Sequence, residues 1–463
     1  MRVYMKYFTQ FLLVLLALAL PAGPGMAQRD TVEHKLGNGM RVIVKTDRRA
    51  PVAVMMLNYQ VGSVDEVNGV TGVAHVLEHM MFKGTPTHPA GEYSRAIAGT
   101  GGRDNAFTSN DYTGYFATVQ KSHLELALRL EADRMANLTL SPEEFAKEIK
   151  VVMEERRLRT DDRPRALVYE QLMATALTAH PYRYPIIGWM NDLENLRVED
   201  ARDFYRRWYA PNNATLVVVG DVGADEVVAL AEKYFGAIPA RDLPERKPQD
   251  EPPQLGAKRV TVKAPAELPY VLMAFRTPAL RDPEREWEPY ALEMLAAVLD
   301  GSEAARLSRT LVREERIASS ADASYDSIAR GPGFFYLGAI PTPGRSAADV
   351  EQALRREMAR IIEEGVNEEE LNRVKAQAVA AHVFQRDSMF FQARQIASLE
   401  SAGISHRTLD LQLAKLREVT PEQVREVARN YFRDDALTIA TLDPQPLEGA
   451  RRAKPSLPLR HAQ

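Results

Sequence analysis

Residues 41–45 read RVIVK, and the apolar run VAVMMLNY follows after Pro51. The same arrangement returns later in the chain, where residues 259–263 read RVTVK and the run YVLMAFRT follows after Pro269. Both matches lie at one offset, and self-similarity at a fixed long offset indicates duplicated structural units. The alternating, β-branched character of these stretches predicts a pair of strands at the start of each unit.

The two units also end alike. The stretch LRVEDARDFYRRWYAPNNATLVVVGD at residues 196–221 resembles VTPEQVREVARNYFRDDALTIATLD at residues 419–443. The segment between the units is rich in proline and charge, which is typical of an exposed linker. We therefore predict a first domain, a linker, a homologous second domain and a flexible tail, at residues 28–239, 240–258, 259–445 and 446–463.

The pattern within the first unit predicts strands at its two ends with helices between them. Ser141, followed by Glu143 and Glu144, is a typical helix N-cap. Apolar periodicity predicts helices over residues 72–82, 122–137, 141–159 and 198–209, and a buried strand over residues 215–219. This order favours an α+β fold with two homologous repeats, each a largely antiparallel sheet covered by helices.

The first 27 residues have the features of a secretory signal peptide. Arg2 and Lys6 precede the apolar run FLLVLLALAL at residues 11–20, and the small residues that follow end at Ala27. The apolar run is shorter than the about 20 residues that span a bilayer, so we expect no stable membrane anchor. The sequence contains no cysteine, which excludes disulfides and a lipidated cysteine. The pattern predicts an exported protein, and a bacterial periplasm fits best.

The overall charge is nearly balanced. The chain has 59 basic and 63 acidic residues, so no excess of positive charge is available for a polyanionic partner. We therefore expect no nucleic-acid partner.

Residues 75–79 read HVLEH and place two histidines four residues apart. On a helix, His75 and His79 lie on one face, and Glu78 lies about 100° around the helix from His79. Neutral imidazole and carboxylate suit Zn²⁺, and this spacing is the inverted zinc-peptidase motif. The simpler alternative is a pair of ordinary core or surface histidines. A catalytic zinc site also needs a third protein ligand elsewhere in the chain.

Glutamates further along the chain could provide that ligand. Glu148, Glu154 and Glu155 fall on one predicted helix, and Glu148 and Glu155 are two turns apart on one face. From composition alone, these residues are more typical of a solvated charged face.

With these motifs, the chain from about residue 30 to residue 445 resembles the pitrilysin and insulysin family of zinc peptidases, in particular the short two-domain branch that includes mitochondrial processing peptidase. The resemblance implies one Zn²⁺ per chain, with Glu155 as the third ligand beside His75 and His79, and with Glu148 supporting that ligand. The stretch NAFTSNDYTGYF at residues 105–116 resembles the family's edge strand, which implies that Asn105, Ala106 and Phe107 bind a peptide substrate as an added β-strand.

The resemblance also implies a reaction, the hydrolysis of a peptide bond. Zinc lowers the pKa of a bound water from 15.7 to roughly 7 and polarises the scissile carbonyl. Glu78 is then the catalytic base, which takes a proton from the attacking water and delivers it to the leaving amine.

The second unit departs from the family pattern. Leu292, Leu295 and Ala296 stand where the first unit has His75, Glu78 and His79. The family places an arginine and a tyrosine here to hold the substrate and stabilise the tetrahedral intermediate. Arg313 matches the arginine, whereas Ser319 or Ser320 stands at the position of the tyrosine.

Three explanations for the missing tyrosine stay open. Tyr325 could replace it, or a paralogous subunit could provide the arginine and tyrosine in a heterodimer, which we favour over a homodimer. Alternatively, the chain could be a catalytically weak or inactive scaffold. The complete set of His75, Glu78, His79 and Glu155 argues against the scaffold, because a scaffold does not need a catalytic base.

Overall fold

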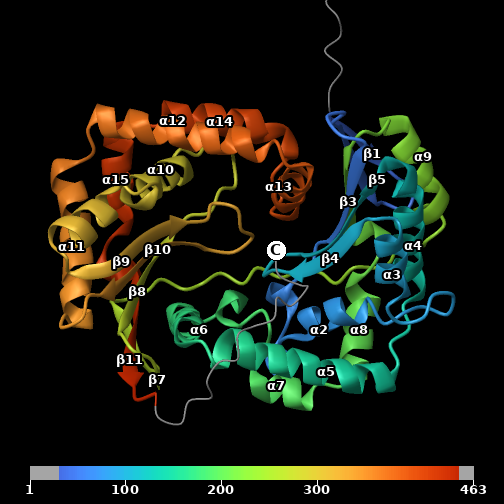
Figure 1. Ribbon diagram of the computed structural model, residues 1–463, viewed down its shortest axis with the longest axis horizontal. Helices are drawn as coiled ribbons and strands as arrows, with labels where there is room; N and C mark the ends of the chain where they lie inside the picture. Colours follow the sequence, from blue (N-terminus) through green and yellow to red (C-terminus); the bar gives the residue numbers. More distant parts are fainter. Residues whose placement is uncertain (1–30, 448–463) are drawn as a thin grey trace, which may run out of the picture.

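The computed structural model describes residues 31–447 (Figure 1). The predicted signal peptide, and all but the first two residues of the predicted tail, lie outside the described residues. Among the described residues, none of the helices combines the length and apolar content that crossing a membrane requires.

The first half contains a six-stranded sheet in the order β1-β2-β6-β3-β5-β4. Strands β2 and β6 run parallel, and every other neighbouring pair is antiparallel. Strand β4 is an edge of the sheet, and one side of its backbone is not paired to another strand within residues 31–447. The strands are β1 (Thr31–Lys35), β2 (Arg41–Thr46), β3 (Val52–Tyr59), β4 (Arg103–Thr108), β5 (Thr113–Gln120) and β6 (Ala214–Gly220).

The helices of the first half form between β3 and β6 and after β6. As predicted, Ser141 caps α5, because its hydroxyl accepts a hydrogen bond from the Glu144 N–H at 3.1 Å. The helices are α2 (Val73–Met80), α3 (Glu92–Gly99), α4 (Leu124–Asn137), α5 (Pro142–Arg156), α6 (Pro164–Ala176), α7 (Met190–Asn195), α8 (Val198–Trp208) and α9 (Ala224–Phe235).

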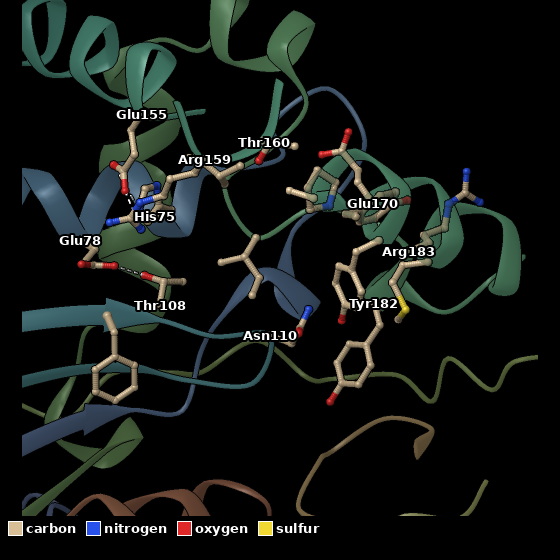
Figure 2. Close-up of a pocket in the computed structure, with 18 of the residues that line it drawn as sticks. His75, Glu78, Thr108, Asn110, Glu155, Arg159, Thr160, Glu170, Tyr182 and Arg183 are labelled. Atoms are coloured by element: carbon tan, nitrogen blue, oxygen red, sulfur yellow. Dashed lines mark hydrogen bonds and ion pairs between the residues drawn. The ribbon is translucent and has the colours of Figure 1, made fainter. Parts of the chain in front are cut away.

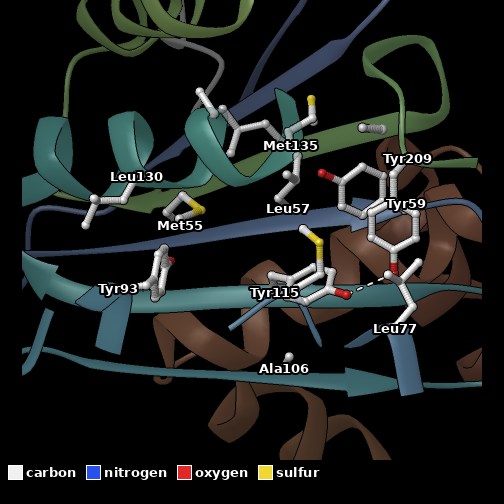
Figure 3. Close-up of a cluster of buried hydrophobic side chains, with 14 of the residues drawn as sticks. Met55, Leu57, Tyr59, Leu77, Tyr93, Ala106, Tyr115, Leu130, Met135 and Tyr209 are labelled. Carbon is white, nitrogen blue, oxygen red and sulfur yellow. Dashed lines mark hydrogen bonds between the residues drawn. The ribbon is translucent and has the colours of Figure 1, made fainter. Parts of the chain in front are cut away.

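The core of the first half holds α2 against the sheet. Leu77 is fully buried in the same apolar cluster as Tyr59 of β3 and Tyr115 of β5 (Figure 3). The Tyr115 hydroxyl lies 2.9 Å from that of Tyr209, so two buried phenols satisfy each other. The apolar residues of α2 face this core, so His75, Glu78 and His79 lie on the rest of the helix surface.

The second half repeats the topology of the first. Its five strands run in the order β7-β11-β8-β10-β9, which corresponds to β2-β6-β3-β5-β4, and β7 and β11 are again the parallel pair. Its strands are β7 (Lys258–Pro265), β8 (Tyr270–Thr277), β9 (Ala318–Tyr325), β10 (Gly333–Pro341) and β11 (Leu437–Gln445). Its helices are α10 (Glu288–Asp300), α11 (Ala347–Glu364), α12 (Glu368–Gln385), α13 (Met389–Ser401), α14 (Leu409–Glu418) and α15 (Pro421–Tyr431). The α+β fold with two homologous, largely antiparallel repeats is thereby confirmed.

One helix of each half packs on the sheet of the other half. Helix α6 of the first half packs on the second sheet, where Leu172 lies in one cluster with Leu272 and Ala440. Helix α13 of the second half packs on the first sheet, where Ile396 lies in one cluster with Met56. Figure 1 shows α13 beside β3. Each sheet therefore buries one face against its own helices and the other against a helix of the opposite half.

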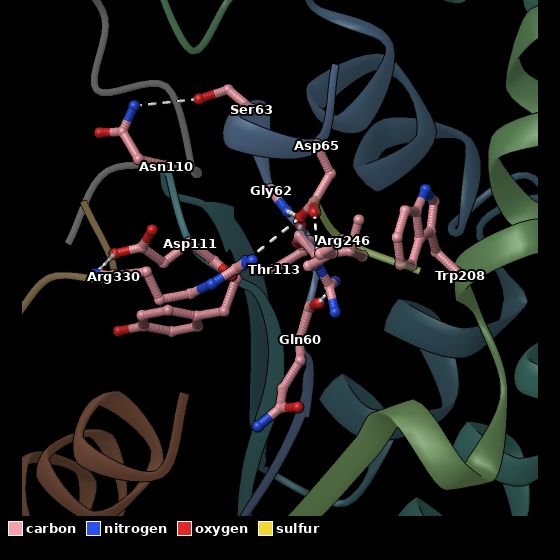
Figure 4. A network of polar contacts seen from close by, with 12 residues as sticks. Gln60, Gly62, Ser63, Asp65, Asn110, Asp111, Thr113, Trp208, Arg246 and Arg330 are labelled. Atoms are coloured by element: carbon pink, nitrogen blue, oxygen red, sulfur yellow. Dashed lines mark hydrogen bonds and ion pairs between the residues drawn. The ribbon is translucent and has the colours of Figure 1, made fainter. Parts of the chain in front are cut away.

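A polar contact also joins the halves close to the cavity described below (Figure 4). In the loop between β9 and β10, the Arg330 N–H donates to Asp111 Oδ2 at 3.0 Å, and the Arg330 guanidinium lies 3.3 Å from Asp65 Oδ2. The next residue, Gly331, donates its N–H to the Tyr182 hydroxyl at 2.8 Å, and that hydroxyl donates to Asp111 Oδ1 at 2.5 Å.

The segment between the halves is bound along the surface. Residues 239–257 contain no helix or strand. Arg246 Nε donates to Asp65 Oδ1 at 2.6 Å, and the Glu251 carboxylate accepts backbone hydrogen bonds from Thr178, Ala179 and His180 at 2.7 to 2.8 Å. The exact domain boundaries given above stay a prediction.

Three local features differ from the sequence expectation. Strand β1 was not predicted, since it is short and three of its five residues are exposed. Residues 105–116 are parts of two strands joined by a turn, and only β4 is the edge strand. The helix predicted to continue to residue 159 is regular only to Arg156, after which Arg157–Asp161 form a π-helical turn.

Candidate metal centre

Helices α2 and α5 bring three predicted ligands together. His75 and His79 lie one turn apart on α2, and Glu155 approaches them from the last turn of α5. Glu155 Oε2 is 3.3 Å from His79 Nε2 and 3.9 Å from His75 Nε2. The three ligand atoms lie within 4.8 Å of one another, and no other set of three or more such side chains in the described residues is as close.

The donor set fits a zinc ion. Two ligands at about 2.0 to 2.1 Å from a tetrahedral ion lie about 3.3 Å apart, which is close to the separation of His79 Nε2 and Glu155 Oε2. Two imidazoles and one carboxylate are also the three protein ligands of a catalytic site that keeps one position open. Burial, followed by the nearby His79 charge, lowers the pKa of His75 to about 3, so His75 is a neutral ligand at physiological pH.

Glu148 orients one of the ligands. His79 Nδ1 lies 2.9 Å from Glu148 Oε1, and Lys83 Nζ lies 2.5 Å from Glu148 Oε2. Burial alone raises the pKa of Glu148, but these two partners lower it below its usual value. With an ion bound, a carboxylate acceptor on Nδ1 would hold the proton there and leave the Nε2 lone pair to the ion. The resemblance implied that Glu148 supports Glu155, whereas in the structure Glu148 contacts the ligand His79.

Glu78 lies beside the three ligands without joining them. Its Oε2 accepts a hydrogen bond from the Thr108 hydroxyl of β4 at 2.5 Å (Figure 2). Burial raises the pKa of Glu78 to about 6. A carboxyl group with a pKa near the working pH can both accept and release a proton.

A cavity of about 370 Å³ opens beside these groups. Ala106 and Phe107 of β4 line it, whereas Asn105 does not, and the Asn105 side chain instead accepts a hydrogen bond from the Ala106 N–H at 2.9 Å. A run of residues at 182–187 also lines the cavity, and Figure 2 labels Tyr182 and Arg183 of this run. Sequence reasoning missed Tyr169 and Met173 of α6, which line the cavity too. No spacing pattern marks these two residues, because α6 reaches the cavity only through the tertiary fold.

Two protein-family models match the chain. The family model described as Insulinase (Peptidase family M16) matches residues 41–189, and the model described as Peptidase M16 inactive domain matches residues 195–378. The chain is 31% identical over 443 residues to the zinc protease PqqE of Helicobacter pylori, covering 94% of this chain and 97% of that protein. The chain belongs to peptidase family M16.

Solved structures show the same fold. The crystal structure of a protease from Helicobacter pylori matches this M16 chain with a TM-score of 0.85 at 29% identity, over 89% of this chain and 99% of that one. The periplasmic protease PqqL of Escherichia coli matches with a TM-score of 0.77 at 21% identity, over 91% of this chain but 48% of that one. Together, the family and the zinc proteases among its relatives support a metallopeptidase.

The second half of this M16 protein holds apolar packing where the first half has the motif. Leu292 and Leu295 are fully buried in the core of the second half, and Ala296 packs against that core. These side chains have no atoms that bind a metal. Among the described residues, the one group found that could hold a metal ion is His75, His79 and Glu155 of the first half.

The residues expected to hold the substrate from the second half do not line the cavity. Arg313 is exposed and donates to the Glu303 carbonyl at 2.7 Å. The Tyr325 hydroxyl donates to the Pro278 carbonyl at 2.7 Å, and its ring stacks on Phe335. Tyr325 is therefore engaged elsewhere and does not stand in for the missing tyrosine in this conformation.

Proposed function

We propose that this M16 protein is a zinc metalloendopeptidase that hydrolyses peptides or unfolded polypeptides. The observation that carries the proposal is the convergence of His75, His79 and Glu155 beside Glu78 at the wall of a cavity. A scaffold has no use for a buried carboxyl group with a raised pKa next to three ligands.

Each side chain has a distinct part in this reaction. His75, His79 and Glu155 would hold the ion, one per chain. Zn²⁺ in such a site lowers the pKa of a water from 15.7 to about 7 and polarises the scissile carbonyl. Glu78 accepts a proton from the attacking water and passes it to the leaving amine, and the Thr108 hydroxyl keeps its carboxylate in place.

The edge strand β4 provides the binding surface for the peptide. Its outer side has no neighbouring strand among the described residues, so an extended peptide can add there through main-chain hydrogen bonds. Ala106 and Phe107 face the cavity from this strand, next to the Glu78 partner Thr108. A peptide bound in this way would lie beside the catalytic base, and binding would not require a particular peptide sequence.

The test is Glu78→Gln, which keeps the size and hydrogen-bonding capacity of the side chain but removes its basicity. We expect peptide hydrolysis to fall about 10²- to 10⁴-fold, while zinc content stays at the wild-type level. Glu154→Gln is the matched control, because Glu154 is an exposed neighbour of a ligand. A Glu78→Gln protein with wild-type activity would overturn the proposal.

We also propose that the full active site forms with a second chain, in a heterodimer with a paralogous subunit that provides an arginine and a tyrosine. Two observations support this. Arg313 and Tyr325 bond away from the cavity, and PqqL contains about twice the length that this chain matches. Peptidase activity should then rise sharply when the partner is added. Full activity of the isolated chain as a monomer would contradict the proposal, and full activity of a homodimer would replace the paralogue with a second copy.

We propose that the protein acts in the periplasm. Support comes from the signal-like first 27 residues and from the periplasmic name of the structural neighbour PqqL. Fractionation of cells that express the full chain should recover it, shortened at the N-terminus, in the periplasmic fraction. Recovery of the uncleaved chain in the cytoplasm would exclude this location.

A further inference from the structure

An arginine binds the outer oxygen of the ligand Glu155. Helix α5 stops being regular after Arg156, and the next residues, Arg157–Asp161, form a π-helical turn. From this turn, Arg159 Nη1 lies 2.7 Å from Glu155 Oε1. Figure 2 shows Arg159 beside Glu155 and His75, at the wall of the cavity. Single π-helical turns are rare and are frequent at functional sites.

The two oxygens of Glu155 are therefore used differently. Oε2 faces the two histidines, at 3.3 Å from His79 and 3.9 Å from His75. Oε1 lies 2.7 Å from Arg159 Nη1, in an ion pair. A close arginine–carboxylate ion pair favours one rotation of the carboxylate over the others.

We propose that Arg159 is a positioning residue for the metal ligand Glu155. By occupying Oε1, it makes the carboxylate offer a single oxygen to the ion and keeps a coordination position open for water. This inference rests on the proposed zinc-peptidase function. The ligand His79 contacts the charged residue Glu148, and the ligand Glu155 contacts the charged residue Arg159. Two of the three ligands are therefore each held by a charged residue.

Arg159 has two opposite effects on zinc affinity. Its positive charge repels the ion and makes Glu155 a weaker base, whereas its close contact with Oε1 holds Glu155 in the binding geometry. The Arg159 side chain is 41% exposed, so solvent screens its charge, while the 2.7 Å separation in this ion pair depends on direct contact. We therefore expect the positioning effect to be larger. Losing an outer partner of a metal ligand typically weakens metal binding about 10- to 100-fold.

The experiment measures zinc dissociation constants by competition with a chromophoric chelator, which does not depend on activity. Arg159→Ala should bind zinc about 10- to 100-fold more weakly than wild type. Arg159→Lys, which keeps the charge without the planar fork, should fall between them. Arg157→Ala is the matched control, since Arg157 belongs to the same turn and pairs with the exposed Glu154. It should bind zinc as wild type does.

X-ray absorption of the zinc-loaded proteins provides the second readout. We expect one carboxylate oxygen at the wild-type zinc and an added oxygen, from a bidentate Glu155, in Arg159→Ala. Unchanged affinity and unchanged coordination in Arg159→Ala would overturn the inference, and so would equal losses in Arg159→Ala and Arg157→Ala. The proposed function fails separately, if the wild-type protein binds no zinc. If Arg159→Ala does not fold, Arg159→Lys still decides the question by its affinity.

Discussion

Helices α2 and α10 occupy the same place in the two halves, because α2 follows β3, α10 follows β8, and these two strands correspond in the two sheets. Helix α2 carries His75, Glu78 and His79, and both His75 and Glu78 are 8% exposed. Helix α10 has Leu292 and Leu295 at the matching positions, both 0% exposed. The same helix position therefore carries candidate metal ligands in one half and apolar core residues in the other. The fold requires a helix at this position, but it does not require that the helix carry either metal-binding or apolar side chains there.

The difference has an energetic side. Leucines at this position gain the free energy of apolar burial, about 1.5 to 3 kcal/mol for a side chain of this size. Buried polar groups lose solvation and need partners, which Glu78 finds in Thr108 and His79 finds in Glu148. The buried Nδ1 of His75 has no hydrogen-bond partner among the described residues. The first half thus gives up stability at the place where it gains a reactive site.

The largest expected effect comes from substitutions at the matching positions of α2 and α10. His79→Ala makes the first half resemble Ala296 of the second half and removes a ligand, so zinc should be lost and activity should fall about 1,000-fold or more. Leu292→Ala should keep one zinc per chain but lower the free energy of unfolding by about 2 to 5 kcal/mol. Elemental analysis, a peptidase assay and denaturant unfolding check the pair. Zinc loss in Leu292→Ala with a folded protein would break the comparison.

Substitutions in α6 and α13 test whether the two halves unfold as one cooperative unit, and their expected effect is smaller. Leu172 of α6 and Ile396 of α13 each pack on the sheet of the opposite half and are 0% and 1% exposed. Leu172→Ala and Ile396→Ala should each lower the free energy of unfolding by about 2 to 5 kcal/mol. Because each helix belongs to one half and packs on the other, we expect one cooperative transition in both variants. Two separate transitions, seen by fluorescence and circular dichroism, would show that the halves unfold independently.

The smallest effect concerns pH at the contact between the halves. Burial lowers the pKa of His180 to about 4, and its Nδ1 accepts a hydrogen bond from the Tyr182 N–H at 3.2 Å, which requires neutral imidazole. The unfolded chain, with a histidine pKa near 6.5, binds more protons between about pH 6.5 and 4. Stability should therefore fall as the pH drops through this window, by up to about 3 kcal/mol from this residue.

The variant His180→Gln tests that pH dependence. It should show a smaller loss of unfolding free energy between pH 7 and pH 4 than the wild type does, whatever its stability at pH 7. The ring packs against Gly331 of the second half, where an added Cβ would lie 2.4 Å from His180 Cε1. An unchanged difference between the two pH values would mean that the charge of His180 does not oppose folding.

The sequence predicted the features that depend on local periodicity and on matched motifs. The internal repeat predicted two related α+β halves, and the HVLEH motif predicted two ligands on one helix face. The family resemblance added Glu155 and Glu148, which lie close to these histidines. The exchange of α6 and α13 was not predictable, because an apolar helix face does not say which sheet it covers. Arg159 was missed because its role depends on a π-helical turn that ordinary helix periodicity does not reveal.

The most direct test of the central claim is the zinc content of the purified protein, measured together with activity before and after chelation. We predict one zinc per chain, loss of peptide hydrolysis when the zinc is removed, and recovery when zinc is restored. Glu155→Gln should contain much less zinc, since it lacks the carboxylate ligand. Peptide hydrolysis by a metal-free protein, or full zinc content in Glu155→Gln, would contradict the account.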